Sequence, residues 1–169
     1  MSKIRFTEPN REILARRDSI INDLTRLVDP AGLITSTDEC RAYETDALTA
    51  YRKMPLAVVL PKTTEEVSAV LKYCHDTGVK VVPRGAGTSL AGGAIPSEDA
   101  VVLGLSKMNR VLAVNYDDRF IRVEAGVTNL SVTAVVAENG FFYAPDPSSQ
   151  LACTIGGNIA NNSGGAPCL

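Results

Sequence analysis

The sequence that decides the fold reads LAVVLPKTTEEVSAVLKYCHDTGVKVVPRGAGTSLAGG over residues 56–93. The apolar run Ala57–Leu60 predicts a buried strand, and Thr63–Glu66 has the spacing of a capping box that opens a helix. Gly78 is well placed to end that helix before a second strand at Val79–Val82. A strand, a helix and another strand in succession are typical of a parallel sheet, so we expect an α/β arrangement from about residue 55.

On either side of this unit, hydrophobic periodicity predicts further elements. Before it, we expect an amphipathic helix over Pro9–Val28 and a shorter helix opened by the capping box Ser36–Glu39. After it, we expect strands at Val101–Leu103, Val111–Tyr116, Phe120–Glu124 and Phe141–Tyr143, a hairpin turn at Asp117–Asp118, and a helix over Thr128–Asn139 closed by Gly140. The predicted organisation is an N-terminal helical region, 1–54, followed by two α/β subdomains, about 55–104 and from about 105.

Composition excludes several classes of protein. The 169 residues include 17 Lys and Arg against 19 Asp and Glu, a net charge of −2, so a basic surface for nucleic acid is not expected. No apolar run is long enough for a transmembrane helix and the first residues lack the core of a signal peptide, so we expect a soluble, cytoplasmic protein. The four cysteines form no CxxC pair, so we expect ordinary reduced thiols and no metal site. They are Cys40, Cys74, Cys153 and Cys168.

The glycine-rich segment Arg84–Gly93 follows the second predicted strand, at the sheet edge where α/β folds bind ligands. Glycines let successive backbone N–H groups point into one concavity that can hold a phosphate, and Thr88 and Ser89 add hydroxyl donors. The segment matches neither the GxGxxG fingerprint of dinucleotide-binding folds nor a Walker loop, since no Gly-Lys occurs in the chain. A tight connector between strands remains the structural alternative.

A second side-chain-poor segment lies further along the chain. PDPSS over 145–149 is a rigid polar turn, and IGGNIANNSGG over 155–165 places paired glycines around an uncharged stretch. From Ala125 to the end, only Glu138 and Asp146 are charged. Small residues let a flat ligand or another backbone approach closely, so two such segments could close on one extended nucleotide.

Three motifs together carry a family resemblance: YETDALTAYRKMPLAVVLPKTTEEV over 43–67, PRGAGTSLAGG over 83–93 and YAPDPSSQLACTIGGNIANNSGG over 143–165. They resemble the FAD-binding region of the p-cresol methylhydroxylase and vanillyl-alcohol oxidase superfamily, above all the branch of glycolate oxidase D subunits and D-lactate dehydrogenases. The resemblance runs from about Asp38 to the end. It implies an α+β fold, a p-cresol methylhydroxylase-type FAD-binding domain that is incomplete here and is preceded by the helical region.

The resemblance also implies the residues that contact the cofactor. In such proteins the first segment wraps the diphosphate of FAD, and the later segments lie near the isoalloxazine and ribityl chain. The positions carried over are Arg84, Gly85, Ala86, Gly87, Thr88, Ser89, Gly92, Pro145, Ser148, Ser149, Thr154, Gly156, Gly157, Asn158 and Gly164. Some relatives attach FAD covalently through a histidine in the first segment, where this chain has Thr88 and Ser89. The resemblance therefore implies non-covalent FAD.

Five other residues are candidates for chemistry, and each has a structural explanation that we favour. His75, the single histidine, suits a solvated helix end, and the acidic pair at 117–118 suits a turn better than a metal site. Arg52 could approach a substrate carboxylate, but a surface role is expected. Cys153 could line the flavin site without being reactive.

The resemblance implies the FAD-binding part of a flavin-dependent 2-hydroxy-acid oxidoreductase, of the glycolate or D-lactate type, that transfers hydride from substrate to FAD. Such relatives continue past the second glycine segment, so we expect a truncated chain or a fragment that is inactive alone, with catalytic base and any metal ligands beyond Leu169. Expected partners are a small hydroxy acid and electron-transfer subunits. The alternatives are a non-catalytic nucleotide-binding or assembly module and a flavin reductase of a sugar nucleotide.

Overall fold

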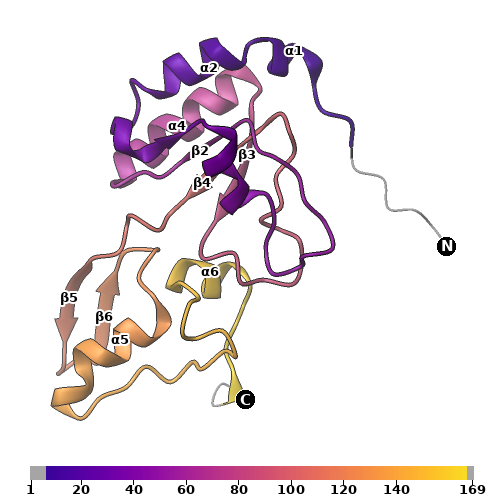
Figure 1. The fold of residues 1–169 in the computed structure, drawn as a ribbon. Coiled ribbons are helices and arrows are strands. Elements are labelled where there is room, and N and C mark those ends of the chain that lie inside the picture. The colour runs from indigo at the N-terminus through magenta and orange to yellow at the C-terminus, as the bar shows by residue number, and fades with distance from the viewer. Residues whose placement is uncertain (1–6, 167–169) are drawn as a thin grey trace.

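The computed structural model describes residues 7–166, which form a mixed helix and sheet structure (Figure 1). The helices are α1 (Arg11–Ala15), α2 (Arg17–Leu24), α3 (Thr37–Cys40), α4 (Thr64–Thr77), α5 (Asn129–Val136) and α6 (Ile155–Ala160), with 3-10 turns η1 (Pro30–Gly32), η2 (Arg41–Tyr43) and η3 (Ala137–Asn139). The strands are β1 (Leu33–Ile34), β2 (Ala57–Val59), β3 (Lys80–Arg84), β4 (Ala100–Gly104), β5 (Val111–Asn115) and β6 (Phe120–Val123).

The larger sheet has the strand order β1-β2-β4-β3. Strands β2 and β3 both run parallel to β4, which lies between them, and β1 adds an antiparallel edge. The predicted strand–helix–strand unit is confirmed: the Thr63 hydroxyl accepts the N–H of Glu66 at 3.2 Å at the start of α4, and Gly78 ends the helix with φ +74°. This unit delivers the glycine-rich segment to the carboxyl edge of the sheet.

Alternate residues of the central strands face two cores. On one face, Ala57 and Val101 pack with the N-terminal helices and α4, where Leu24 and Val70 are fully buried. On the other face, Val58 and Val102 pack with Cys40 and Leu60. Figure 1 shows α2 and α4 together along this sheet. The N-terminal helices therefore share a core with the sheet, and the expected division at residues 54/55 stays a prediction about domain organisation.

A buried carboxylate joins the N-terminal segment to the sheet. Asp99, which is 1% exposed, accepts hydrogen bonds from Lys80 Nζ at 2.8 Å, the Ser97 hydroxyl at 2.6 Å and the backbone N–H of Asn10 at 2.8 Å. Burial raises the pKa of Asp99, but these hydrogen bonds outweigh it and hold the pKa at about 2. The ionised form of Asp99 therefore stabilises the fold.

The second part of the chain forms a hairpin, β5–β6, covered by α5 (Figure 1). The predicted turn at its tip is confirmed, since the Asn115 side chain accepts the N–H of Asp118 at 2.8 Å. Helix α5 buries Val132 and Val136, and Gly140 follows η3 with φ +78°. Figure 1 shows α6 between this part and the four-stranded sheet.

Two expectations differ from the structure. The helix expected over Pro9–Val28 is two helices, because the N–H of Arg16 bonds to the Ile13 carbonyl and tightens the chain between α1 and α2. The strand expected at Phe141–Tyr143 is wrong: Phe142 is 72% exposed, and the N–H of Tyr143 donates to the Thr133 hydroxyl instead of a strand.

The structure also contains a short strand and a helix that were not predicted from the sequence. Strand β1 has only two residues and is defined by its pairing with β2. Helix α6 forms within the second glycine segment, where the Thr154 hydroxyl caps it by accepting the N–H of Gly157 at 3.2 Å. Paired glycines disfavour helix, so tertiary contacts must supply its stability.

Candidate functional site

The two glycine-rich segments meet across a cleft of about 640 Å³. This volume lies within the range of about 300–1,000 Å³ that is usual for small-molecule and cofactor sites. Contact between the segments is close: a Cβ added at Gly85 would lie 2.6 Å from Thr154 Oγ1, and the nearest atoms of Gly157 would follow at 3.6 Å. Glycine is therefore needed at residue 85 because the walls of the cleft touch there.

The first wall of the cleft is formed by the segment Arg84–Gly93, and some of its backbone donors are unpaired within residues 7–166. Among residues 7–166, no acceptor is bonded to the N–H groups of Ala86, Gly87, Thr88 or Ser89, and all four residues line the cleft. Gly87 has φ +73°, a left-handed conformation that other residues adopt at a cost. Successive free N–H groups in a turn of this kind form a concavity suited to an anion such as a diphosphate.

In the second wall of the cleft, which is formed by the second glycine segment, backbone N–H groups are bonded within the protein. The N–H of Gly156 donates to the Ala125 carbonyl at 2.9 Å, and that of Ile155 donates to the Val127 carbonyl at 2.8 Å. An added Cβ at Gly156 would lie 2.8 Å from Ala125 Cβ, so the segment packs tightly against the chain before α5. Thr154 bridges to Thr128 and is buried. This wall therefore offers a ligand side chains and surface rather than backbone donors.

One polar group in the second wall has no partner. Asn158 is 6% exposed and lines the cleft, and its Nδ2 makes no hydrogen bond with any residue between 7 and 166. An unpaired buried donor is costly, and a bound ligand that accepts from it removes that cost. Thr88, Ser148 and Ser149, which carry hydroxyl groups, also line the cleft. The cleft thus presents neutral donors to an acceptor-rich ligand.

Of the fifteen cofactor residues expected from the resemblance, twelve line the cleft: Arg84, Gly85, Ala86, Gly87, Thr88, Ser89, Ser148, Ser149, Thr154, Gly156, Gly157 and Asn158. Three lie outside its lining. Gly92 turns with φ +75° beside Leu48, the Pro145 carbonyl accepts from the Asn129 side chain at 2.9 Å, and the Gly164 carbonyl accepts the N–H of Asp146 at 2.8 Å. These three support neighbouring turns. Their contact with FAD stays a prediction.

The lining also includes residues that sequence reasoning did not single out. Asn161 and Ser163 belong to the second glycine segment, where the motif itself could have suggested them. Leu105 follows β4 and Ala125 follows β6; they carry no such signal, because only the tertiary fold brings them to the cleft.

Arg84 is the single charged residue on the lining that the described residues form. Its guanidinium, however, donates from Nη1 to the Thr45 carbonyl at 2.7 Å and lies 5.6 Å from the centre of the Tyr43 ring. Burial lowers the pKa of Arg84, and the nearby Tyr43 and Asp46 partly offset this by favouring the charged form. The charge of Arg84 is thus directed at the segment 43–51.

The remaining candidates lie where their structural explanations place them. His75 is exposed near the end of α4, and Arg52 pairs with Glu44 at 3.1 Å on the surface. Cys153 is buried and lines the cleft. Cys40, Cys74 and Cys153 form no disulfide, and Cys168 lies outside the described residues. Within residues 7–166, no helix has the length and apolarity to cross a membrane.

Comparison with known proteins agrees with this geometry. The family described as FAD binding domain matches residues 55–169. Glycolate oxidase subunit GlcD of Escherichia coli is 47% identical over 153 residues, 90% of this chain and 31% of that protein. D-lactate dehydrogenase of Archaeoglobus fulgidus is 38% identical, over 89% of this chain and 33% of that protein. D-2-hydroxyglutarate dehydrogenase of Xanthomonas citri is 36% identical, over 88% and 31%.

The chain spans about a third of the length of these relatives. Among solved structures, alkyldihydroxyacetonephosphate synthase has a TM-score of 0.78 at 21% identity, over 93% of this chain and 30% of that one. p-Cresol methylhydroxylase has a TM-score of 0.72 at 22% identity, over 89% and 30%. These scores confirm the expected fold, as part of a domain. Through residues 55–169, the chain belongs to the FAD binding domain family, and FAD is the cofactor of that family.

Proposed function

We propose that the chain is the FAD-binding part of a flavin-dependent 2-hydroxy-acid oxidoreductase of the glycolate or D-lactate type. The observation that carries the proposal is the cleft between two glycine-rich walls. Within residues 7–166, four N–H groups on one wall and the Asn158 amide nitrogen on the other have no hydrogen-bond partner. The choice of substrate class is supported by the relatives, which are named for glycolate, D-lactate and D-2-hydroxyglutarate.

In the proposed complex, residues 86–89 hold the diphosphate through backbone N–H groups, and the hydroxyl of Thr88 adds a donor. Negative charge on the ligand suits this wall because its free dipoles are already oriented. On the opposite wall, Asn158 donates a hydrogen bond to an acceptor of the cofactor. The cofactor is thereby held from both sides of the cleft. When bound, FAD supplies the hydride-accepting chemistry, and the protein supplies binding and orientation.

We further propose that the cofactor is held without a covalent bond. The cleft lining formed by the described residues contains no histidine, and His75 lies on α4 outside that lining. The catalytic base, the substrate site and any partner subunits for electron transfer are proposed to lie outside this segment. The division into residues 1–54 and 55–169 is likewise a proposal, and the cytoplasmic location stays a prediction.

A spectroscopic titration of the longest open reading frame that contains the chain tests this proposal. The purified protein should show flavin absorbance bands. Acid or heat should release the flavin as free FAD. Glycolate, D-lactate or D-2-hydroxyglutarate should bleach those bands under anaerobic conditions. A protein that stays colourless with added FAD would favour the non-catalytic module, and bleaching only by a reduced nicotinamide nucleotide would favour the sugar-nucleotide reductase.

A further inference from the structure

The segment 43–51 is tied to the glycine-rich wall at two places. Arg84 Nη1 donates to the Thr45 carbonyl at 2.7 Å, and the N–H of Ala47 donates to the Ser89 carbonyl at 3.1 Å. Leu48 also packs near Gly92. The two bonds lie at either end of residues 85–88, and the N–H groups of residues 86–89 have no acceptor among residues 7–166.

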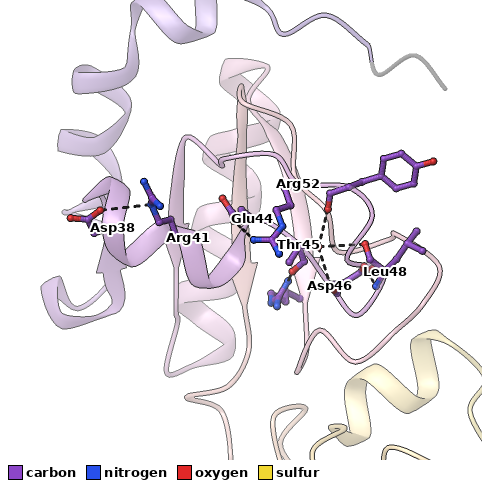
Figure 2. A network of polar contacts seen from close by, with 9 residues as sticks. Asp38, Arg41, Glu44, Thr45, Asp46, Leu48 and Arg52 are labelled. Atoms are coloured by element: carbon purple, nitrogen blue, oxygen red, sulfur yellow. Dashed lines mark hydrogen bonds and ion pairs between the residues drawn. The ribbon is translucent and has the colours of Figure 1, made fainter. Parts of the chain in front are cut away.

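The segment 43–51 is itself held by internal bonds, which Figure 2 shows around the Thr45 side chain. The Thr45 hydroxyl donates to the Tyr51 carbonyl at 2.8 Å, and the Asp46 carboxylate accepts the N–H of Leu48 at 2.9 Å. Asp46 is 4% exposed, and its other oxygen has no hydrogen-bond partner among residues 7–166. The segment is therefore a folded support that contains a buried carboxyl group.

The side chain of Arg84 fills the space beneath the glycine-rich turn. A Cβ added at Gly87 would lie 2.2 Å from Arg84 Nη2 and 2.5 Å from Cζ. The guanidinium also lies over the Tyr43 ring, and the buried Asp46 favours its charged form. A guanidinium enclosed by a carbonyl, an aromatic ring and a glycine turn is held in one orientation, which a flexible ammonium would not reproduce.

We propose that Arg84 is a positioning residue that locks the glycine-rich turn onto the segment 43–51, and that it is not the cation that neutralises the diphosphate. This inference rests on the proposed FAD site. It predicts that the diphosphate is bound by neutral donors, with Arg84 acting only through the shape of residues 85–89. It also gives Gly87 a second reason to be glycine, because the turn must pass over the guanidinium.

The test compares Arg84→Lys, Arg84→Gln and the control Arg52→Gln, which removes an exposed guanidinium paired with Glu44 on the same segment. Dissociation constants for FAD are measured by flavin fluorescence at several salt concentrations. We expect both Arg84 variants to weaken FAD binding at least tenfold with an unchanged salt dependence. The control Arg52→Gln should change the dissociation constant for FAD less than twofold. If Arg84→Lys binds like the wild type, or Arg84→Gln flattens the salt dependence, Arg84 is the cation and the proposal is wrong.

A second measurement does not depend on FAD. Thermal midpoints of the cofactor-free protein are compared for Arg84→Gln, Tyr43→Leu and the double variant. The proposal requires the double variant to lose clearly less than the two single losses together, because each change breaks the same contact. Additive losses would overturn it. Failure of all proteins to bind FAD would instead reject the proposed function and leave this cycle to decide the role of Arg84.

Discussion

Replacing Gly85 with alanine should separate the two walls of the cleft. The added Cβ would lie 2.6 Å from Thr154 Oγ1, a distance that real Cβ atoms do not show. Thr154 cannot yield freely, because it is buried and its hydroxyl caps α6 by accepting the N–H of Gly157. Gly85→Ala therefore forces either the glycine-rich turn or the start of α6 to move.

The size of the effect follows from these contacts. Overpacking at a tight site costs about 1–3 kcal/mol, and loss of a helix cap costs about 0.5–2 kcal/mol. If Thr154 moves, the clash is relieved but the helix cap is lost, so the two costs do not add in full. We therefore expect Gly85→Ala to lower the free energy of unfolding by about 1–3 kcal/mol. For a chain of this size, 1 kcal/mol corresponds to about 2–4 °C in thermal midpoint.

The assay is thermal unfolding followed by circular dichroism, with Gly93→Ala as the matched control. Gly93 lies in the same glycine-rich segment, and an added Cβ there meets no atom within 4 Å. The control should unfold within about 1 °C of the wild type. In a Thr154→Ala background, which removes the clashing atom, Gly85→Ala should cost at least 1 kcal/mol less. Equal costs in the two backgrounds would refute the reasoning.

Three further predictions concern other parts of the fold. The low pKa of Asp99 contributes stability that is present above about pH 4 and is lost as the pH falls toward 2; it amounts to about 2.5 kcal/mol. Urea unfolding should therefore show a deficit for Asp99→Asn at pH 6 that shrinks below pH 4, and a constant deficit would contradict this. Asn158→Leu should leave the FAD-free protein as stable or more stable, since it removes an unpaired buried donor, but should weaken FAD binding about tenfold; parallel losses of both would speak against a ligand role. Burial raises the pKa of Cys74 to about 11, so iodoacetamide at pH 8 should label it only in denaturant, as peptide mapping would show; rapid labelling of the native protein would exclude this packing.

Much of the fold between residues 55 and 104 could be predicted because its signals are local. The capping box at Thr63 and the stop at Gly78 define α4 without tertiary information, and the apolar run 57–60 can only be a buried strand next to them. The glycine-rich wall was likewise recognisable, since glycines after a strand mark the ligand edge of such sheets.

The remaining features depend on contacts between distant residues. Strand β1 exists because two residues pair with β2, and α6 forms although Gly156 and Gly157 disfavour a helix. The direction of the Arg84 side chain was also not predictable, because Thr45 and Tyr43 reach it from another segment. The motif predicted the lining of the cleft but not the inward or outward orientation of its one charge.

The central claim is that backbone N–H groups of residues 86–89 bind the diphosphate of FAD. The most direct test is hydrogen exchange at these amides, measured by mass spectrometry or NMR with and without FAD. Because the four groups have no acceptor among residues 7–166, they should exchange rapidly in the free protein and at least tenfold more slowly with FAD, while the amides of α4 stay unchanged. If saturating FAD leaves residues 86–89 as rapidly exchanging as before, the cleft is not the diphosphate site.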